Sequence, residues 1–178
     1  MQKEILIAGF GGQGVLFAGQ VLTYAAMDTG HEVTWIPSYG PEMRGGTANC
    51  TVVISDEEIG SPFVHMPQAV IAMNRPSLDK YEPLVRPGGV LVVNSSMVDR
   101  PVERTDIQVV EVDANGQAEK LGDQRMANMI LLGALLSKLP VLPVEAVEKA
   151  LKDHLPARHQ RLLSQNYQAL REGAGFDV

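Results

Sequence analysis

Residues 4–19, EILIAGFGGQGVLFAG, decide the fold. They begin with Glu4–Ala8, a short apolar run of the kind that forms a buried strand, and continue directly into the glycine-rich segment Gly9–Gly14. Apolar residues then recur with a period near 3.6 over residues 15–29, which predicts a helix. Residues 31–36 again have strand character. This order predicts the strand–helix–strand opening of a Rossmann-like fold, with a right-handed crossover if its two strands are parallel.

The rest of the chain extends this pattern. Four more apolar or alternating segments predict a sheet of about six strands, and the last third reads as helices only. We therefore expect an α/β fold with three α/β/α layers, a mostly parallel, doubly wound sheet and a C-terminal helical cluster, all in a single domain of residues 1–178. The further expected strands are 47–55, 69–73, 90–94 and 108–112, and the further expected helices are 75–84, 114–121, 125–139, 143–154 and 156–171.

Composition excludes several classes of protein. Hydrophobic residues make up 45% of the 178 residues and charged residues 20%, which is typical of a globular domain and not of a disordered chain. The net charge of −6 offers no basic surface, so we do not expect a nucleic-acid partner. The opening residues are too acidic, and the apolar run behind them too short, for a secretory signal. The longest apolar stretch, Met126–Leu136, is about half of the roughly 20 residues that span a bilayer, so we expect a cytoplasmic protein outside the membrane.

The chain is poor in residues that perform redox or covalent chemistry. Cys50 is its only cysteine, so it forms no internal disulfide and cannot supply the four thiolates of an iron–sulfur cluster. Cys50 lies in a predicted strand, where a buried, inert thiol is expected. The four histidines show no spacing typical of a metal site, and no G-x-S-x-G elbow is present. We expect no catalytic residue and no metal ligand, and no cofactor that this chain holds by itself.

The first candidate site is the glycine-rich turn. It fits G-x-G-x-x-G between a strand and a helix, where a phosphate can approach the free N–H groups of the helix N-terminus. An NAD site would also need an acidic residue at the end of the second strand, but Ile36–Ser38 lies there, and a P-loop would need a lysine where Val15 follows the glycines. The alternative is that the glycines only pack the helix against the strand. The candidate residues of this turn are Gly9, Gly11, Gly12, Gln13 and Gly14.

The second candidate site is the loop expected over Ser38–Gly46, at the end of a strand beside the glycine-rich turn. Its arginine, Arg44, can pair with a carboxylate or phosphate, and Glu42 can orient that arginine. The alternative is a surface loop with a solvated Glu–Arg pair. Asn128 is a further candidate because it lies inside an apolar helix, where its amide needs a partner, although a structural hydrogen bond is the stronger expectation. The candidates of this group are Tyr39, Glu42, Arg44, Gly45 and Asn128.

The two glycine-containing segments together resemble the gamma subunit of 2-oxoacid:ferredoxin oxidoreductases. The segments are GFGGQGV at 9–15 and YGPEMRGG at 39–46. The resemblance covers the whole chain, including the strand at 51–55 with IGSP at 59–62 after it, and LGAL at 132–135. It implies that the two loops lie together and face a neighbouring catalytic chain, where they help to hold CoA or close over the active site.

The resemblance also implies what the other chains of the complex do. Alpha and beta subunits bind thiamine diphosphate, a ferredoxin-like delta subunit carries iron–sulfur clusters, and ferredoxin receives the electrons. A 2-oxoacid and CoA become an acyl-CoA and carbon dioxide. Met43 resembles the 2-oxoglutarate or branched-chain type of the family more than the pyruvate type.

Two other functions remain open on the residues alone. The chain can be a stand-alone nucleotide-binding protein, or an assembly module whose loops touch only protein. The helix at 125–139 is apolar nearly all round, so it is either central to the core or covered by a partner, including a second copy of the isolated chain.

Overall fold

The computed structural model describes residues 1–40 and 45–175 and shows an α/β fold around a six-stranded sheet. The strand order is β2-β3-β1-β4-β5-β6. β1, β4, β5 and β6 are parallel neighbours, whereas β3 is antiparallel to both β1 and β2. The mostly parallel α/β sheet predicted from the sequence is confirmed. The strands are β1 (Gln2–Phe10), β2 (Glu32–Tyr39), β3 (Thr47–Ser55), β4 (Ala69–Ala72), β5 (Val90–Asn94) and β6 (Gln108–Val112).

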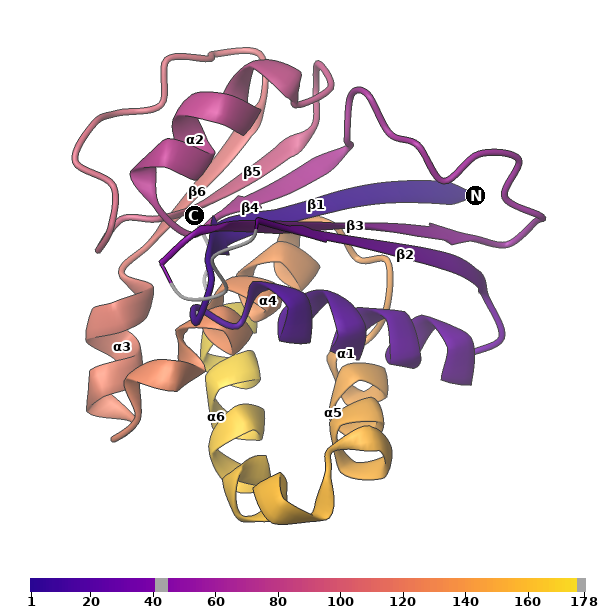
Figure 1. Ribbon diagram of the computed structural model, residues 1–178, viewed down its shortest axis with the longest axis vertical. Coiled ribbons are helices and arrows are strands. Elements are labelled where there is room, and N and C mark those ends of the chain that lie inside the picture. Colours follow the sequence, from indigo (N-terminus) through magenta and orange to yellow (C-terminus); the bar gives the residue numbers. More distant parts are fainter. Residues whose placement is uncertain (41–44, 176–178) are drawn as a thin grey trace.

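The opening strand–helix–strand unit is present, but its two strands are not neighbours. β1 and β2 run in the same direction because each is antiparallel to β3, which lies between them. The hairpin of β2 and β3 therefore adds β3 directly to β1 and leaves β2 at the edge of the sheet (Figure 1). The helices cover both faces of this sheet.

The second strand is longer than predicted, so the predicted start of the second loop at Ser38 is wrong. β2 continues through Pro37 to Tyr39, whereas the sequence predicted a strand ending at Ile36 and a loop from Ser38. A proline is tolerated here because β2 is an edge strand, whose outer side needs no ladder hydrogen bond. Tyr39 therefore lies on a strand, in register with Ala48.

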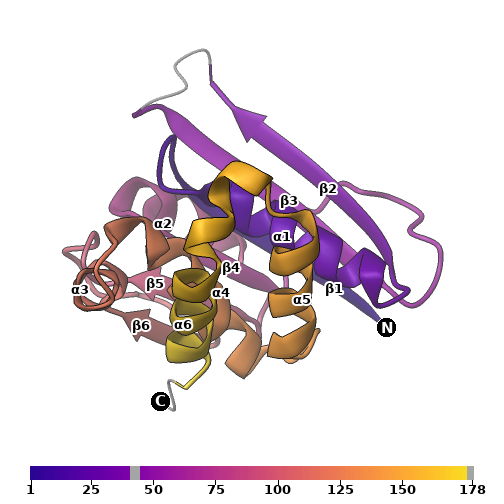
Figure 2. The same ribbon diagram turned by 90° about the horizontal axis from the view of Figure 1, so that it is seen from below.

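The helices form unequal layers. Helices α1 and α4 lie under the sheet with α5 and α6 below them, and α2 covers the opposite face (Figures 1 and 2). None of the described helices is long and apolar enough to cross a membrane. The helices are α1 (Val15–Asp28), α2 (Arg75–Tyr81), α3 (Ala114–Lys120), α4 (Ala127–Lys138), α5 (Val144–His154) and α6 (Leu163–Ala174), with 3₁₀ segments η1 (Glu82–Leu84), η2 (Gln124–Met126) and η3 (Ala157–Leu162).

The C-terminal helices differ from prediction at one point. A single helix over 156–171 was expected, but Pro156 is followed by the 3₁₀ segment η3, and the α-helix α6 begins only at Leu163. The Asn166 side chain donates to the Leu162 carbonyl at 2.8 Å, so this break carries a side-chain hydrogen bond of its own. No glycine or proline marks the break, which is why the sequence does not reveal it.

Helix α4 is the centre of the larger core. Its residues from Asn128 to Leu136 are all buried, and they lie among the sheet, α1, α3 and α6 of the same chain. The apolar surface of this helix, for which the sequence left a partner as one possibility, is thus covered by other elements of the same chain. A homodimer gains no support from this helix.

Helices α4 and α6 approach each other closely because each carries a glycine at the crossing. A Cβ atom built on Gly133 would overlap the Leu170 carbonyl oxygen, and one built on Gly173 would overlap the Ile130 carbonyl oxygen. The two backbones are therefore in direct contact, as in other helix pairs with small residues at their interface. Any side chain at either glycine would force the helices apart.

Glu82 is a buried carboxylate that fixes the connection 95–107 between β5 and β6. Its Oε1 accepts hydrogen bonds from the backbone N–H groups of Glu103 at 2.6 Å and Arg104 at 2.9 Å. Its Oε2 accepts from the Arg100 guanidinium at 2.8 Å. Burial alone would raise the pKa of Glu82, but these donors outweigh it and lower the pKa below the ordinary value of 4.5. The charged form is therefore the stabilising one.

Replacing Glu82 with glutamine is expected to lower the free energy of unfolding at pH 7 by about 1–3 kcal/mol, because the amide cannot serve all three donors. The loss should shrink in acid. The carboxylate has a lower pKa folded than unfolded, so its contribution is full above the unfolded value and disappears as pH falls through the folded value. Urea denaturation at pH 7 and at pH 3.5 measures both effects, because these two pH values lie on either side of the pKa of about 4.3 for a glutamate in the unfolded chain. The exposed neighbour Glu103→Gln is the control, and equal losses in the two variants would contradict this role.

Candidate functional site

The two glycine-containing segments meet at one end of the sheet. β1 runs directly into the turn Gly9–Gly14, and the return of the β2–β3 hairpin passes beside that turn. The Gly11 N–H donates to the Gly46 carbonyl at 2.8 Å, and the Gly45 N–H donates to the Gly11 carbonyl at 3.3 Å. The segments that the sequence singled out separately are thus joined by a pair of backbone hydrogen bonds.

The N-terminus of α1 is uncapped at the glycine-rich turn. Gly14 is the N-cap residue, it offers no side-chain cap, and the first turn of α1 carries no acidic residue. Gly12 and Gly14 have φ values of 98° and 75°, the left-handed region that favours glycine. A Cβ at Gly12 would meet no atom within 4 Å, so the backbone there is open to a ligand. Uncapped N–H groups at the start of a 14-residue helix suit a phosphate or carboxylate.

Other residues of the turn have structural contacts. A Cβ at Gly9 would lie 2.9 Å from Val15 and 3.0 Å from Met73, so Gly9 allows close packing of strand and helix. The Gln13 Oε1 accepts from the Phe10 N–H at 2.7 Å and from an asparagine amide at 3.0 Å. These contacts occupy the Gln13 side-chain oxygen within the protein.

Asn128 joins α4 to the glycine-rich turn. Its Nδ2 donates to the Gly14 carbonyl at 3.2 Å, and its Oδ1 accepts from the Met129 N–H at 2.9 Å. This contact also requires a glycine at position 14, because a Cβ there would overlap the Asn128 amide. The structural hydrogen bond expected for this buried amide is confirmed, and the same residue lines the neighbouring cavities.

A row of amides that was not predicted from the sequence lies at the carboxyl ends of β4 and β5. Asn74 caps α2 by accepting from the Ser77 N–H at 2.9 Å, and its Nδ2 is the donor to Gln13. Asn94 donates to Asn115 at 2.8 Å, while no donor among the described residues meets the Asn94 Oδ1. Each of Asn74 and Asn94 follows or ends a buried parallel strand, which is the signal that could have found them.

Gly12 of the turn lines two cavities. The smaller, about 220 Å³, lies over the strand ends and is lined by Gly12, Gln13 and the amides Asn94, Asn115 and Asn128. The larger, about 520 Å³, lies between α1 and the α5–η3–α6 segment. Gly12, Arg125 and Asn128 line both, so the turn stands at the junction of a polar and a largely apolar cavity.

The predicted residues of the second loop are placed only in part. Tyr39 is 57% exposed at the end of β2, and Gly45 contacts Gly11. Glu42 and Arg44 lie outside the described residues, so their predicted roles stay predictions.

Cys50 is buried in β3, and burial raises the pKa of its thiol to about 12, which confirms the expected inert cysteine. Across residues 1–40 and 45–175, no three His, Cys, Asp or Glu side chains cluster as metal ligands. The arrangement is suited to binding an anionic, polar ligand through backbone N–H groups and amides.

Comparison with known proteins identifies the family. Residues 4–176 match the family described as pyruvate ferredoxin/flavodoxin oxidoreductase. The chain is 41% identical to the 2-oxoglutarate synthase subunit KorC of Methanothermobacter marburgensis, over 97% of this chain and 96% of that subunit. It is 38% identical to the ketoisovalerate oxidoreductase subunit VorA of Methanothermobacter thermautotrophicus over 97% of this chain, but it spans only 36% of the length of that relative.

Solved structures give the same result. The gamma subunit of a keto/oxoacid ferredoxin oxidoreductase from Geobacter sulfurreducens superposes with a TM-score of 0.82 at 31% identity, covering 96% of this chain and 95% of that one. The 2-oxoglutarate:ferredoxin oxidoreductase of Magnetococcus marinus, with 2-oxoglutarate, coenzyme A and succinyl-CoA bound, shares the fold with a TM-score of 0.86 at 24% identity, over 97% of this chain and 30% of that one. The chain therefore belongs to the pyruvate ferredoxin/flavodoxin oxidoreductase family, as one of its gamma-type subunits.

Proposed function

We propose that this chain is the gamma subunit of a multi-subunit 2-oxoacid:ferredoxin oxidoreductase in the cytoplasm. The reaction is the oxidative decarboxylation of a 2-oxoacid with CoA, which yields an acyl-CoA, carbon dioxide and reduced ferredoxin. The observation that carries this proposal is the near end-to-end match to a 2-oxoglutarate synthase subunit.

The redox and carbon–carbon chemistry of the complex belongs to other chains. Thiamine diphosphate supplies the electron sink for decarboxylation, and iron–sulfur clusters carry the electrons to ferredoxin. A four-thiolate cluster does not fit here, because the one thiol of this chain, Cys50, is buried in a strand, and the sequence has no Gly-Asp-Gly with a later Asn-Asn pair of the thiamine-diphosphate type. We assign these groups to alpha and beta subunits and a ferredoxin-like delta subunit.

The part of this chain in the proposed reaction is to hold CoA and to shape the active site. The uncapped N-terminus of α1 and the open backbone at Gly12 suit a phosphate of CoA. The guanidinium of Arg44 is expected to pair with a phosphate, and the polar cavity over the strand ends offers amides to the rest of the nucleotide. The Magnetococcus marinus enzyme, which shares this fold, was solved with CoA bound.

Purification under anaerobic conditions tests membership of the complex. The chain should be recovered from its native cells together with larger thiamine- and cluster-bearing chains, and it should show no turnover alone. Recovery as a lone monomer would count against the proposal. A rise in melting temperature of the isolated chain with NAD would favour the stand-alone nucleotide-binding alternative.

Replacing Arg44 with alanine in the reconstituted complex is expected to raise KM for CoA about tenfold, because one charge-assisted hydrogen bond to phosphate is lost. Steady-state kinetics with varied CoA measures this, and native mass spectrometry measures assembly. Arg86→Ala is the matched control, because Arg86 lies before β5 at the opposite end of the sheet and pairs with Glu4. Weakened assembly with an unchanged KM would show that the loop serves only protein contacts.

A further inference from the structure

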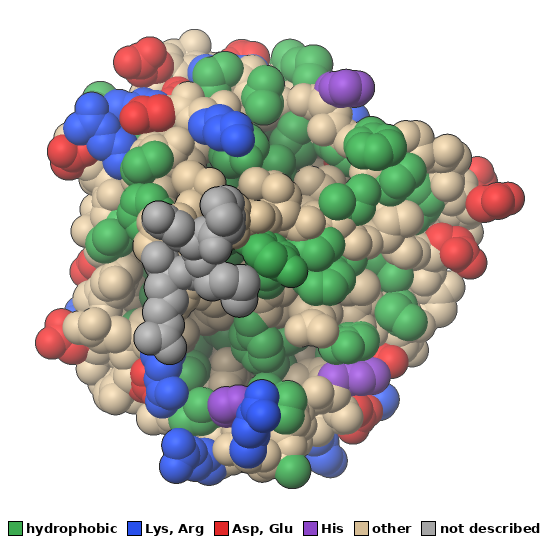
Figure 3. Space-filling view, viewed as in Figure 1, with side chains coloured by type: hydrophobic (Ala, Val, Ile, Leu, Met, Phe, Trp, Pro, Cys, Tyr) green, Lys and Arg blue, Asp and Glu red, His purple; other side chains and the backbone are tan. Residues whose placement is uncertain are grey.

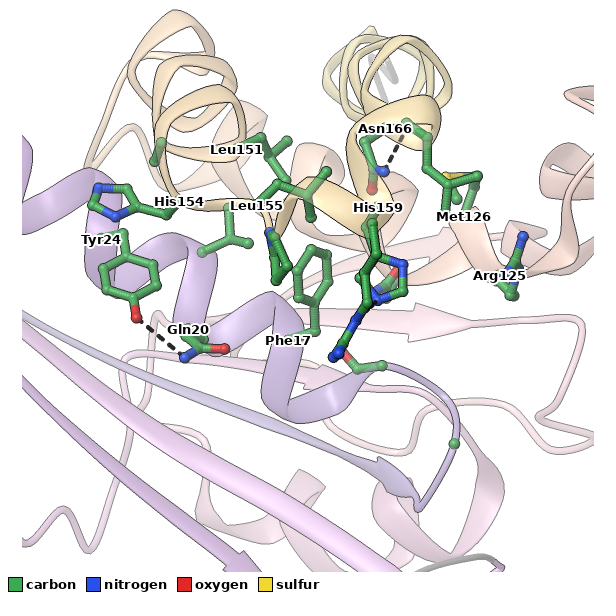
Figure 4. Close-up of a pocket in the computed structure, with 18 residues that line it drawn as sticks. Phe17, Gln20, Tyr24, Arg125, Met126, Leu151, His154, Leu155, His159 and Asn166 are labelled. Atoms are coloured by element: carbon green, nitrogen blue, oxygen red, sulfur yellow. Dashed lines mark hydrogen bonds between the residues drawn. The ribbon is translucent and has the colours of Figure 1, made fainter.

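The larger cavity has the size and enclosure of a small-molecule site. It holds about 520 Å³, within the range typical of ligand pockets. One wall is the outer face of α1, and the other is formed by the end of α5, η3 and the start of α6 (Figure 4). It extends from the glycine-rich turn along α1, away from the strand ends where the polar cavity lies.

The interior of this cavity is apolar and aromatic. Phe17 and Val21 line it from α1, and Leu151 and Leu155 face them from α5 and its C-terminal end (Figure 4). At the far end the Tyr24 ring stacks on His154, with centroids 4.2 Å apart and planes 8° from parallel. Such walls favour a ligand with an apolar body.

The charged groups on the lining are all basic. Arg125, Arg158 and His159 line the cavity together with His154, and no aspartate or glutamate does. Figure 3 shows the hollow on this face with Lys, Arg and His side chains along its lower rim. Arg125 pairs with Asp123 and His154 with Asp28, whereas Arg158 hydrogen-bonds to His159 and has no carboxylate partner within the described part of the chain. A basic rim over an apolar interior is complementary to an organic anion.

Asn166 adds a polar group inside the cavity. Only 4% of its surface is exposed, and its Nδ2 donates a hydrogen bond to the Leu162 carbonyl. Its Oδ1 accepts no hydrogen bond from the residues that the structure describes, and the side chain projects from α6 into the cavity (Figure 4). This oxygen is therefore available to accept a hydrogen bond from a ligand N–H or O–H.

We propose that the cavity between α1 and η3 binds an amphipathic organic anion. The apolar body lies between Phe17 and Leu155, the carboxylate or phosphate meets Arg158 at the rim, and an N–H or O–H of the ligand donates to Asn166. This site adjoins the proposed CoA cradle, because Gly12 and Gly14 line the same cavity, but its polar contacts, Arg158 and Asn166, lie on η3 and α6 and not on the turn or at the strand ends.

Titration of the full-length chain with 8-anilinonaphthalene-1-sulfonate tests the proposal, because this probe combines an apolar body, a sulfonate and an N–H donor. Isothermal calorimetry should show one probe per folded chain. Arg158→Gln should weaken binding about tenfold, equivalent to 1.4 kcal/mol, whereas the neighbouring Arg161→Gln, which lines neither cavity, should leave it unchanged. Equal effects of the two variants, or no stoichiometric binding, would overturn the proposal.

A competition experiment tests the charge and body of the ligand. Octanoate should displace the probe from the wild-type chain, while 1-octanol, which has the same chain length and no charge, should displace it at least tenfold less well. Equal displacement by both would refute the anionic part of the site. These titrations contain no CoA and no partner chain, so their outcome does not depend on the proposed enzymatic function.

Discussion

Replacing Gly173 with alanine is expected to lower the free energy of unfolding by about 3 kcal/mol. The added Cβ would overlap the Ile130 carbonyl oxygen and lie 3.0 Å from the Ala134 nitrogen. Both are backbone atoms of α4, so no rotamer change relieves the clash, and α6 must move outward from the buried face that includes Leu170. The melting temperature should fall by roughly 6–12 °C, at 2–4 °C per kcal/mol for a chain of this length.

The matched control is Gly175→Ala, two residues further along and just past the end of the same helix. A Cβ there would lie 3.6 Å from the Arg171 carbonyl oxygen, an ordinary contact, and its φ of −82° suits any residue. Differential scanning calorimetry of both variants should therefore show a loss only at Gly173. Equal melting temperatures would mean that α4 and α6 do not cross as tightly as described.

Replacing Gly14 with alanine is expected to lower the free energy of unfolding by about 2–5 kcal/mol. A side chain at a φ of 75° costs about 1–2 kcal/mol. The new Cβ would also displace the Asn128 amide from the Gly14 carbonyl, and leaving that buried group unpaired costs about 1–3 kcal/mol. In the assembled complex the same change should weaken CoA binding, because it shifts the N-terminus of α1.

Gly12→Ala separates the two contributions. Gly12 also has a left-handed φ, 98°, but a Cβ there would meet no atom within 4 Å. Only the backbone cost should appear, so urea denaturation should rank wild type above Gly12→Ala and both above Gly14→Ala. If the two variants were equally stable, the contact between Gly14 and Asn128 would contribute nothing.

The sequence was sufficient for the order of elements and for the fold class. Short apolar runs next to glycines and a 3.6-residue period are local signals, and every predicted strand is present within a few residues of its expected bounds. The insertion of β3 between β1 and β2 could not be predicted, because a hairpin and a crossover have the same local pattern. The continuation of β2 through Pro37 depends on its edge position, which is again a property of the whole sheet.

The candidate site was predictable in position more than in detail. The turn and the hairpin meet as expected, since both follow strands that end at the same edge of the sheet. The direction of the Gln13 side chain depends on Asn74, which is 61 residues away, and no local pattern reveals such a contact. The close crossing at Gly133 and Gly173 was missed for the same reason. Gly133 looks like an ordinary small residue of a helix, and the predicted last helix ended at residue 171, before Gly173, whereas α6 continues to Ala174.

The pair of hydrogen bonds between Gly11 and the hairpin has a mechanical consequence. β1 pairs with β3 along its whole length, and Gly45 and Gly46 tie the adjoining end of the β2–β3 hairpin to the turn that begins α1. A neighbouring subunit that moves this end of the hairpin must either move the turn with it or break two backbone hydrogen bonds. By reciprocity, an anion that stiffens the turn would also stiffen this end of the hairpin.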